Sequence, residues 1–174
     1  MFELFKKKYP ILTVSMITPA DQHITTTDAM KIFKQHMLDI GYLEKDELSE
    51  HVGYLSDEIK GHGQYLKDEV TNTKEEIQEA KTELANLKKK LATCSEDEKE
   101  DIEDGIELLV GELGIAAEDL EKYTNKLAEF KKDKRVFLVD YINTQVHGDD
   151  WMSKLRLPHK KTQSLGEVFF GRTR

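Results

Sequence analysis

Apolar residues recur at steps of three and four along the chain between residues 47 and 146, and the steps alternate except where His62, Leu66 and Val70 follow each other by four. This spacing is typical of a coiled-coil seam, where two helices pack their apolar stripes together. The predicted seam of the first arm is Leu48, Val52, Leu55, Ile59, His62, Leu66, Val70, Thr73, Ile77, Ala80, Leu84, Leu87 and Leu91. That of the second arm is Ile102, Ile106, Leu109, Leu113, Ala116, Leu120, Tyr123, Leu127 and Phe130. The sequence therefore predicts a long two-helix hairpin.

The segment between the two arms contains the signals of a tight connection. Three lysines, residues 88–90, end the first arm, where positive charge favours the C-terminal end of the helix dipole. Ser95 and Glu98 then form a capping box, in which each side chain bonds the other residue's backbone amide at a helix start. So short a loop requires antiparallel neighbours, with the tip at 92–95.

The segments outside the hairpin predict a small α+β base. Residues 11–17 are rich in β-branched side chains between Pro10 and Pro19, which is typical of a strand, and 164–170 form a second strand to pair with them. A helix is expected over 27–40, with its apolar face formed by Met30, Phe33, Met37 and Ile40. The predicted fold class is therefore mainly α, a coiled-coil hairpin on an α+β base.

Three regions follow from this pattern. Residues 1–43 supply the N-terminal part of the base, 44–146 the antiparallel hairpin, and 147–174 the C-terminal, basic part of the base. The dense apolar run at 136–142 is interpreted as the second arm entering the base, with a buried strand as the alternative.

Two features of the hairpin have competing interpretations. Gly61 and Gly63 interrupt the first arm, either to make room for Tyr123 across the seam or to form a hinge. Cys94, the only cysteine, lies at the tip and is interpreted as an exposed thiol, with an intermolecular disulfide or metal bridge as the alternative. A single thiol forms no internal disulfide and suits a reducing compartment, so we expect a cytoplasmic protein, with neither a secretory signal nor a membrane span.

Charge is unevenly distributed along the 174 residues. Residues 44–150 contain 15 Lys and Arg against 29 Asp and Glu, a net charge of −14, whereas 151–174 contain six against one, a net +5. The acidic stem repels nucleic acid along its length, and the basic tail attracts acidic partners.

The second arm carries apolar residues that a two-helix seam does not use. Leu108 and Ile115 are seven residues apart, as are Val110 and Ala117, and Gly111 and Gly114 are interleaved with them. Unused apolar stripes indicate a further partner, and glycines permit close approach. We therefore expect a homodimer in which two hairpins form a four-helix bundle, with a partner helix from another protein as the alternative.

No catalytic constellation is recognisable in the sequence. Phosphate-binding, nucleophile-elbow and zinc-helix motifs are absent, and His147, Asp149 and Asp150 lack the further ligands that a metal site needs. We expect neither an enzyme nor a bound cofactor or metal, but a structural or interaction protein that uses the hairpin for self-association or docking.

The alternative function is a nucleic-acid-associated accessory protein. Its contact surface would combine basic residues from the two ends of the chain: Lys6, Lys7, Lys8, Lys154, Arg156, Lys160 and Lys161. No nucleic-acid-binding fold signature accompanies them.

Overall fold

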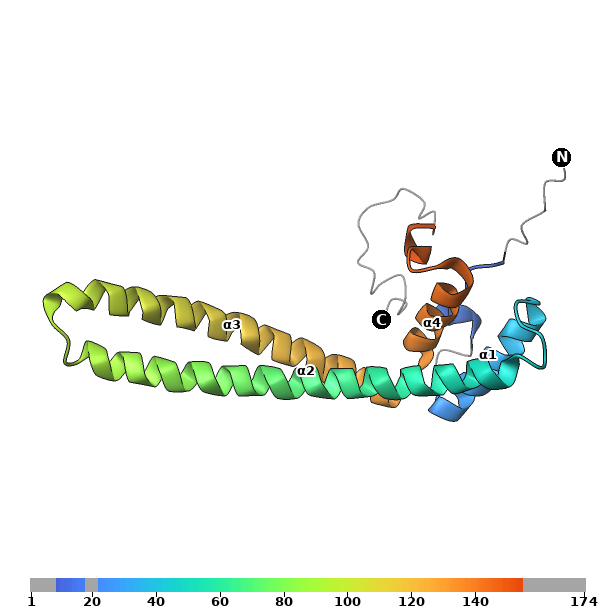
Figure 1. The fold of residues 1–174 in the computed structure, drawn as a ribbon, viewed down its shortest axis with the longest axis horizontal. Coiled ribbons are helices and arrows are strands. Elements are labelled where there is room, and N and C mark those ends of the chain that lie inside the picture. The colour runs from blue at the N-terminus through green and yellow to red at the C-terminus, as the bar shows by residue number, and fades with distance from the viewer. Residues whose placement is uncertain (1–8, 18–21, 155–174) are drawn as a thin grey trace. The chain divides into compact units, whose positions relative to one another are not determined.

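The fold is that of a computed structural model, which describes residues 9–17 and 22–154. The described residues form α1 (Thr26–Asp39), α2 (Leu48–Leu91), α3 (Glu96–Lys132) and α4 (Arg135–His147), with the short 3-10 helices η1 (Val14–Met16) and η2 (Trp151–Lys154) (Figure 1). The chain divides into two compact units. We call Gly61–Glu129 the stem unit, and Met1–Lys60 with Phe130–Arg174 the base unit.

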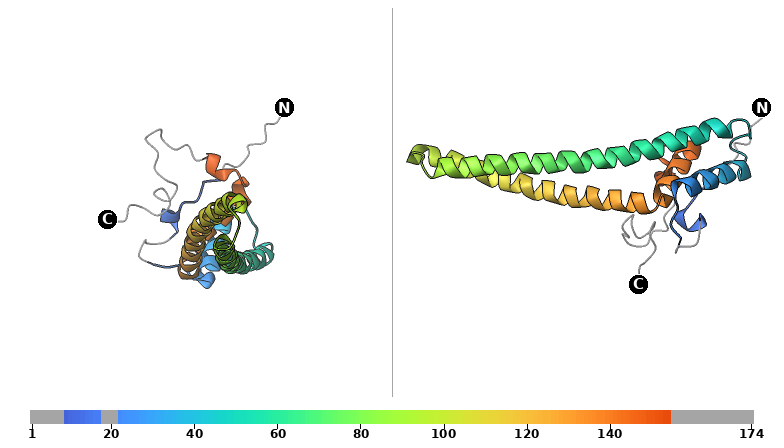
Figure 2. Two further views of the ribbon diagram at one scale, coloured as in Figure 1. Left: turned by 90° about the vertical axis from the view of Figure 1, so that its left-hand side faces the viewer. Right: turned by 90° about the horizontal axis from the view of Figure 1, so that it is seen from below.

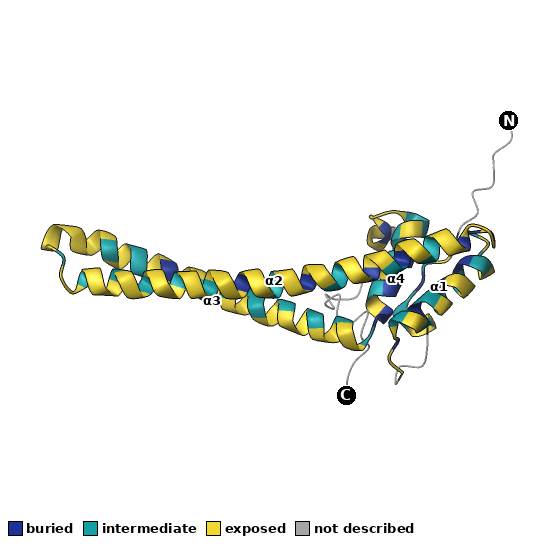
Figure 3. Ribbon diagram, turned by 60° about the horizontal axis from the view of Figure 1, so that its bottom comes forward, coloured by how far each residue is buried: buried dark blue, intermediate teal, exposed yellow. Residues whose placement is uncertain are grey.

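Within the stem unit, α2 and α3 run side by side in opposite directions (Figure 2). The predicted seam positions of this unit are all buried or half-buried, while most positions between them are exposed (Figure 3). Only Leu66, Thr73 and Leu109 are fully buried, because two helices cannot cover a seam from all sides. The predicted helical hairpin is confirmed.

The tip of the hairpin uses half of the predicted capping box. The Glu98 carboxylate accepts from the Ser95 amide at 3.2 Å and from the Ser95 hydroxyl at 2.8 Å. The Glu98 amide, however, donates to the Ser95 carbonyl at 3.2 Å rather than to the hydroxyl. These bonds to its charged form lower the pKa of the Glu98 carboxyl from its ordinary value.

Gly61 of the first arm faces open space. A Cβ added at Gly61 would meet nothing within 4 Å, so room for Tyr123 does not explain this glycine. The Tyr123 hydroxyl lies in hydrogen-bonding contact with Tyr65 and Glu69 of α2.

In the base unit, α1 begins and ends with well-formed caps. Thr25 forms a full capping box with Asp28, one residue before the two threonines that open the helix. At the other end Gly41 adopts a φ of 63°, and the amides of Gly41 and Tyr42 donate to the carbonyls of Leu38 and Met37. This is the Schellman arrangement, in which glycine takes the left-handed position. The expected helix is thus confirmed within a residue at each end.

The core of the base unit joins α1 and α4 to the first turns of α2. Its fully buried side chains include Phe33 and Met37 of α1, Leu138 and Ile142 of α4, and Trp151. The indole Nε1 of Trp151 donates to Asp140 Oδ1 at 3.0 Å, which satisfies the one polar group of that ring. Burial of an aromatic residue beyond the end of α4 fixes the chain after Gly148 onto the core.

The predicted strand at 11–17 is wrong. This segment is extended only up to Thr13, and Val14–Met16 form a 3-10 turn. The backbone of Leu12 pairs with a side chain rather than with a strand: its amide donates to Asn143 Oδ1 at 2.9 Å, and its carbonyl accepts from Asn143 Nδ2 at 2.8 Å. The expected strand at 164–170 lies outside the described residues. The described part of the base is therefore helical, without the predicted β structure.

The apolar run at 136–142 is helical, as expected, but it belongs to a helix separate from the second arm. The break falls at Asp133 and Lys134. Asp133 Oδ1 accepts from the amides of Arg135, at 2.9 Å, and Ile24, at 3.2 Å. The Lys134 ammonium donates to the Phe130 carbonyl and, at 3.4 Å, to that of Lys131, which supplies positive charge where α3 ends.

Candidate interaction surface

The segment of α3 from 108 to 117 is nearly free of charge on every side of the helix. Glu112 is its one charged residue. Leu109, Leu113 and Ala116 face the seam, and the remaining residues project away from it. All six residues expected at a dimer or partner surface are exposed: Leu108, Val110, Gly111, Gly114, Ile115 and Ala117. We call these six the α3 surface.

The large side chains of the α3 surface are exposed to an unusual degree. Leu108 is 65% exposed, Val110 53% and Ile115 66%. A single exposed aliphatic residue needs no explanation. Here Leu108 and Ile115 lie on one face of the helix, and Val110 lies on the other flank of the seam, about 160° from Leu108 at about 100° per residue. Apolar side chains are therefore exposed on both flanks of the seam, which is typical of a helix that packs against further partners.

Part of the α3 surface forms a shallow, open groove along the helix. The residues that line it are Asp104, Glu107, Leu108, Gly111, Glu112 and Ile115. Asp104, Leu108, Gly111 and Ile115 follow steps of four, three and four, which place them on one face of a helix. The face measures about 16 Å from Asp104 to Ile115 at about 1.5 Å per residue.

The glycines of this surface have no role in packing within the described chain. A Cβ added at Gly111 or Gly114 would meet nothing within 4 Å, whereas one at Gly105 would contact Leu87 Cδ1 at 3.4 Å. Each glycine costs roughly 1 kcal/mol relative to alanine in a helix interior. Gly53 and Gly61 of α2 also face open space, but no group of exposed aliphatic residues comparable to the α3 surface surrounds them.

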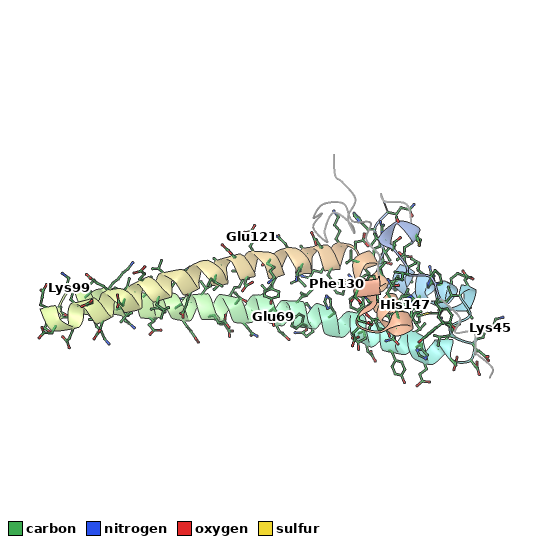
Figure 4. The ribbon with its side chains drawn as sticks, turned by 90° about the horizontal axis from the view of Figure 1, so that it is seen from above. Lys45, Glu69, Lys99, Glu121, Phe130 and His147 are labelled. Carbon is green, nitrogen blue, oxygen red and sulfur yellow. The ribbon has the colours of Figure 1, made fainter. Side chains whose placement is uncertain are left out.

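Carboxylates surround the α3 surface. Residues 100–121 contain nine Asp and Glu and no Lys or Arg. In the part of the chain that the structure describes, no basic side chain forms an ion pair with Asp104, Glu107 or Glu112. Glu121 projects outward from the same helix (Figure 4). Sequence reasoning identified the apolar residues and missed this acidic border, although the run of acidic residues is visible in the sequence.

The candidate basic surface cannot be assembled from the described residues. Lys6, Lys7, Lys8, Arg156, Lys160 and Lys161 lie outside them, and of Lys154 only the backbone, in η2, is described. Nucleic-acid binding through the tail stays a prediction.

The segment that contains His147, Asp149 and Asp150 lies at the end of α4. Gly148, with a φ of 87°, ends α4, and His147 Nε2 lies 3.3 Å from the Pro10 carbonyl. Over residues 9–17 and 22–154, no three His, Cys, Asp or Glu side chains are grouped to hold a metal ion. The Cys94 thiol is half-buried and lies 3.4 Å from the Leu91 carbonyl, which it contacts as a donor.

None of the described helices contains an apolar stretch long enough to cross a lipid bilayer. The α3 surface offers aliphatic side chains and two exposed glycines, and the carboxylates of Asp104, Glu107 and Glu112 border it. Comparison with protein-family models, curated proteins and solved structures finds no match to this chain.

Proposed function

We propose that this chain is a non-catalytic interaction protein, which docks another helical segment on the α3 surface of its stem unit. The observation that carries the proposal is the exposure of Leu108, Val110 and Ile115 within a segment that has a single charge. A helix that is apolar on all sides is normally buried. Here only the seam side is covered.

The energetics of burial support docking at this place. Fully burying one Leu, Ile or Val side chain contributes about 1.5–3 kcal/mol. Leu108 and Ile115, which share one face of α3, therefore hold a few kcal/mol that a partner helix would recover, less the cost of association.

Both occupants expected from the sequence are compatible with this function. A second copy would form a four-helix bundle from two hairpins, and a helix from another protein would form a three-helix arrangement. In either case the stem acts as a docking element rather than as a catalyst.

The test is site-specific photo-crosslinking in the cells that make the protein. A photoreactive phenylalanine derivative replaces Leu108 or Ile115 and, as matched controls, Lys67 or Lys81, which are exposed on α2 of the same unit. We expect covalent adducts from positions 108 and 115 at several times the yield of the controls. Equal yields at all four positions, or no adduct at 108 and 115, would contradict docking. The mass of the adduct separates a second copy from another protein.

A further inference from the structure

We propose that the occupant of the groove on α3 is a basic amphipathic helix of another protein, with one large apolar side chain seated over Gly111 and Lys or Arg residues on both flanks. This inference rests on the proposed docking function and assigns the chemistry of the partner. It follows from the arrangement of charge around the groove.

The two sides of the groove are both acidic. At about 100° per residue, Glu107 and Glu112 lie on opposite sides of the line through Leu108, Gly111 and Ile115, each about 70° away from it. Asp104 closes one end of the same face. A helix that lies in the groove therefore has a carboxylate beside each of its edges, and each carboxylate lacks an ion-pair partner among the described residues.

The floor of the groove specifies what the centre of the partner helix must be. Leu108 and Ile115 stand on either side of Gly111, which has no side chain and no neighbour within 4 Å of its Cβ position. This leaves a notch between two aliphatic side chains. A large apolar residue of the partner fits there as a knob fits a hole in a coiled coil, and the partner residues three and four positions away reach Glu107 and Glu112.

A second copy of this chain has the wrong charge for this groove. An interface between two copies related by a two-fold axis joins the same surface on both sides. It would bring the carboxylates that border the groove, Asp104, Glu107 and Glu112, close to those of the second copy, and residues 100–121 of neither copy contain a Lys or Arg. Like charges placed across an interface oppose association, whereas a basic helix complements this acidic border.

The experiment measures binding of two synthetic helical peptides to the full-length chain by fluorescence anisotropy. Both peptides are about five turns long with the same Leu and Ala seam; one has Lys at the flanking positions, and its twin has Glu. Gly111→Leu fills the notch, and Gly53→Leu is its control, since both glycines are exposed on helices with open space at Cβ. Glu107→Gln with Glu112→Gln neutralises the two sides, and Glu100→Gln with Glu121→Gln removes the same charge from α3 outside the groove.

We expect the wild-type chain to bind the Lys peptide at least about tenfold more tightly than the Glu peptide. Gly111→Leu and the Glu107/Glu112 pair should each weaken that binding about tenfold, while their controls change it little. Equal losses in groove and control variants would show general attraction to an acidic stem and would overturn the proposal. Absence of binding to the Lys peptide would also overturn the proposal. A chain that sediments as a dimer, and that Ile115→Ser converts to a monomer, would overturn it as well.

The two proposals fail separately. Crosslinks from positions 108 and 115 to another protein, without discrimination between the peptides, would retain docking and remove the basic partner. Crosslinks to a second copy or to the chain's own basic tail would likewise remove it.

Discussion

The side-chain amide of Asn143 binds both backbone groups of Leu12, 131 residues earlier in the chain. Both residues are buried, so the amide takes the place of the neighbouring strand that an extended backbone would otherwise need. This pair of hydrogen bonds holds the segment before η1 against α4.

Replacing Asn143 should therefore destabilise the base unit. Asn143→Ala leaves the buried amide and carbonyl of Leu12 without partners, and we expect a loss of about 2–4 kcal/mol in the free energy of unfolding. Trp151, the only tryptophan, is buried in the base unit, so urea unfolding followed by its fluorescence measures this loss. Asn125→Ala, at an exposed position of α3, is the control. Equal midpoints for the two variants would show that the Leu12 pairing contributes nothing.

Alanine at the glycines of the α3 surface should stabilise the stem unit. Gly111→Ala and Gly114→Ala add a Cβ into open space and remove the conformational freedom of glycine in the unfolded chain. We expect each substitution to raise the free energy of unfolding by about 0.5–1 kcal/mol. Urea unfolding monitored by far-ultraviolet circular dichroism measures this gain. Gly148→Ala should instead lower the stability of the base unit, because a φ of 87° is strained for alanine. A loss of stability in Gly111→Ala would mean that this glycine has a packing role in the chain.

The hydroxyl of Tyr123 should ionise later than that of an ordinary tyrosine. Hydrogen bonds with Tyr65 and Glu69, together with the negative charge of Glu69, raise the pKa of Tyr123 to about 12. Because the folded pKa lies above the unfolded value near 10, this contribution to stability is complete below pH 10 and is lost as the pH rises through about 12. Ultraviolet titration should lose this late component in Tyr123→Phe and shift it to lower pH in Glu69→Gln. Glu75→Gln, on the exposed side of α2, should leave it unchanged.

His36 should make the base unit sensitive to mild acid. Burial lowers the pKa of its imidazole below the ordinary value of 6.5, against a smaller opposing effect of Asp39. The folded pKa lies below the unfolded one, so the stability is complete above pH 6.5 and falls as the pH drops through the folded pKa. Thermal melts followed by Trp151 fluorescence should show this loss in the wild type and a smaller one in His36→Gln. His51→Gln serves as the matched change; the same loss in both variants would exclude His36 as its cause.

Much of the stem could be predicted from the sequence because its information is local. The spacing of Leu66, Thr73 and Leu109 within their arms is enough to place them in the seam, and all three are buried. The tip could be predicted for the same reason, since the hydrogen bond between Ser95 and Glu98 joins residues only three positions apart. The residues of the α3 surface could be predicted as well, because they are the apolar residues that the seam does not use, and they are exposed.

The base was less predictable because its decisive contacts join residues far apart in the chain. Val14 and its neighbours have the composition of a strand, yet the partner of Leu12 is the side chain of Asn143, which no local pattern indicates. The break between α3 and α4 was missed for the same reason: the Ile24 amide binds Asp133 from 109 residues away, and the apolar pattern continues through the break.

The sequence by itself thus determined the hairpin, its tip and the apolar residues of the α3 surface, since helix periodicity and caps depend on residues within one or two turns. Only the tertiary structure decided that the backbone of Leu12 is held by the side chain of Asn143 and that α4 is a separate helix. These features depend on which groups meet in space. A buried backbone N–H needs an acceptor, but a side chain satisfies it as well as a neighbouring strand does, so the local sequence does not say which one it meets.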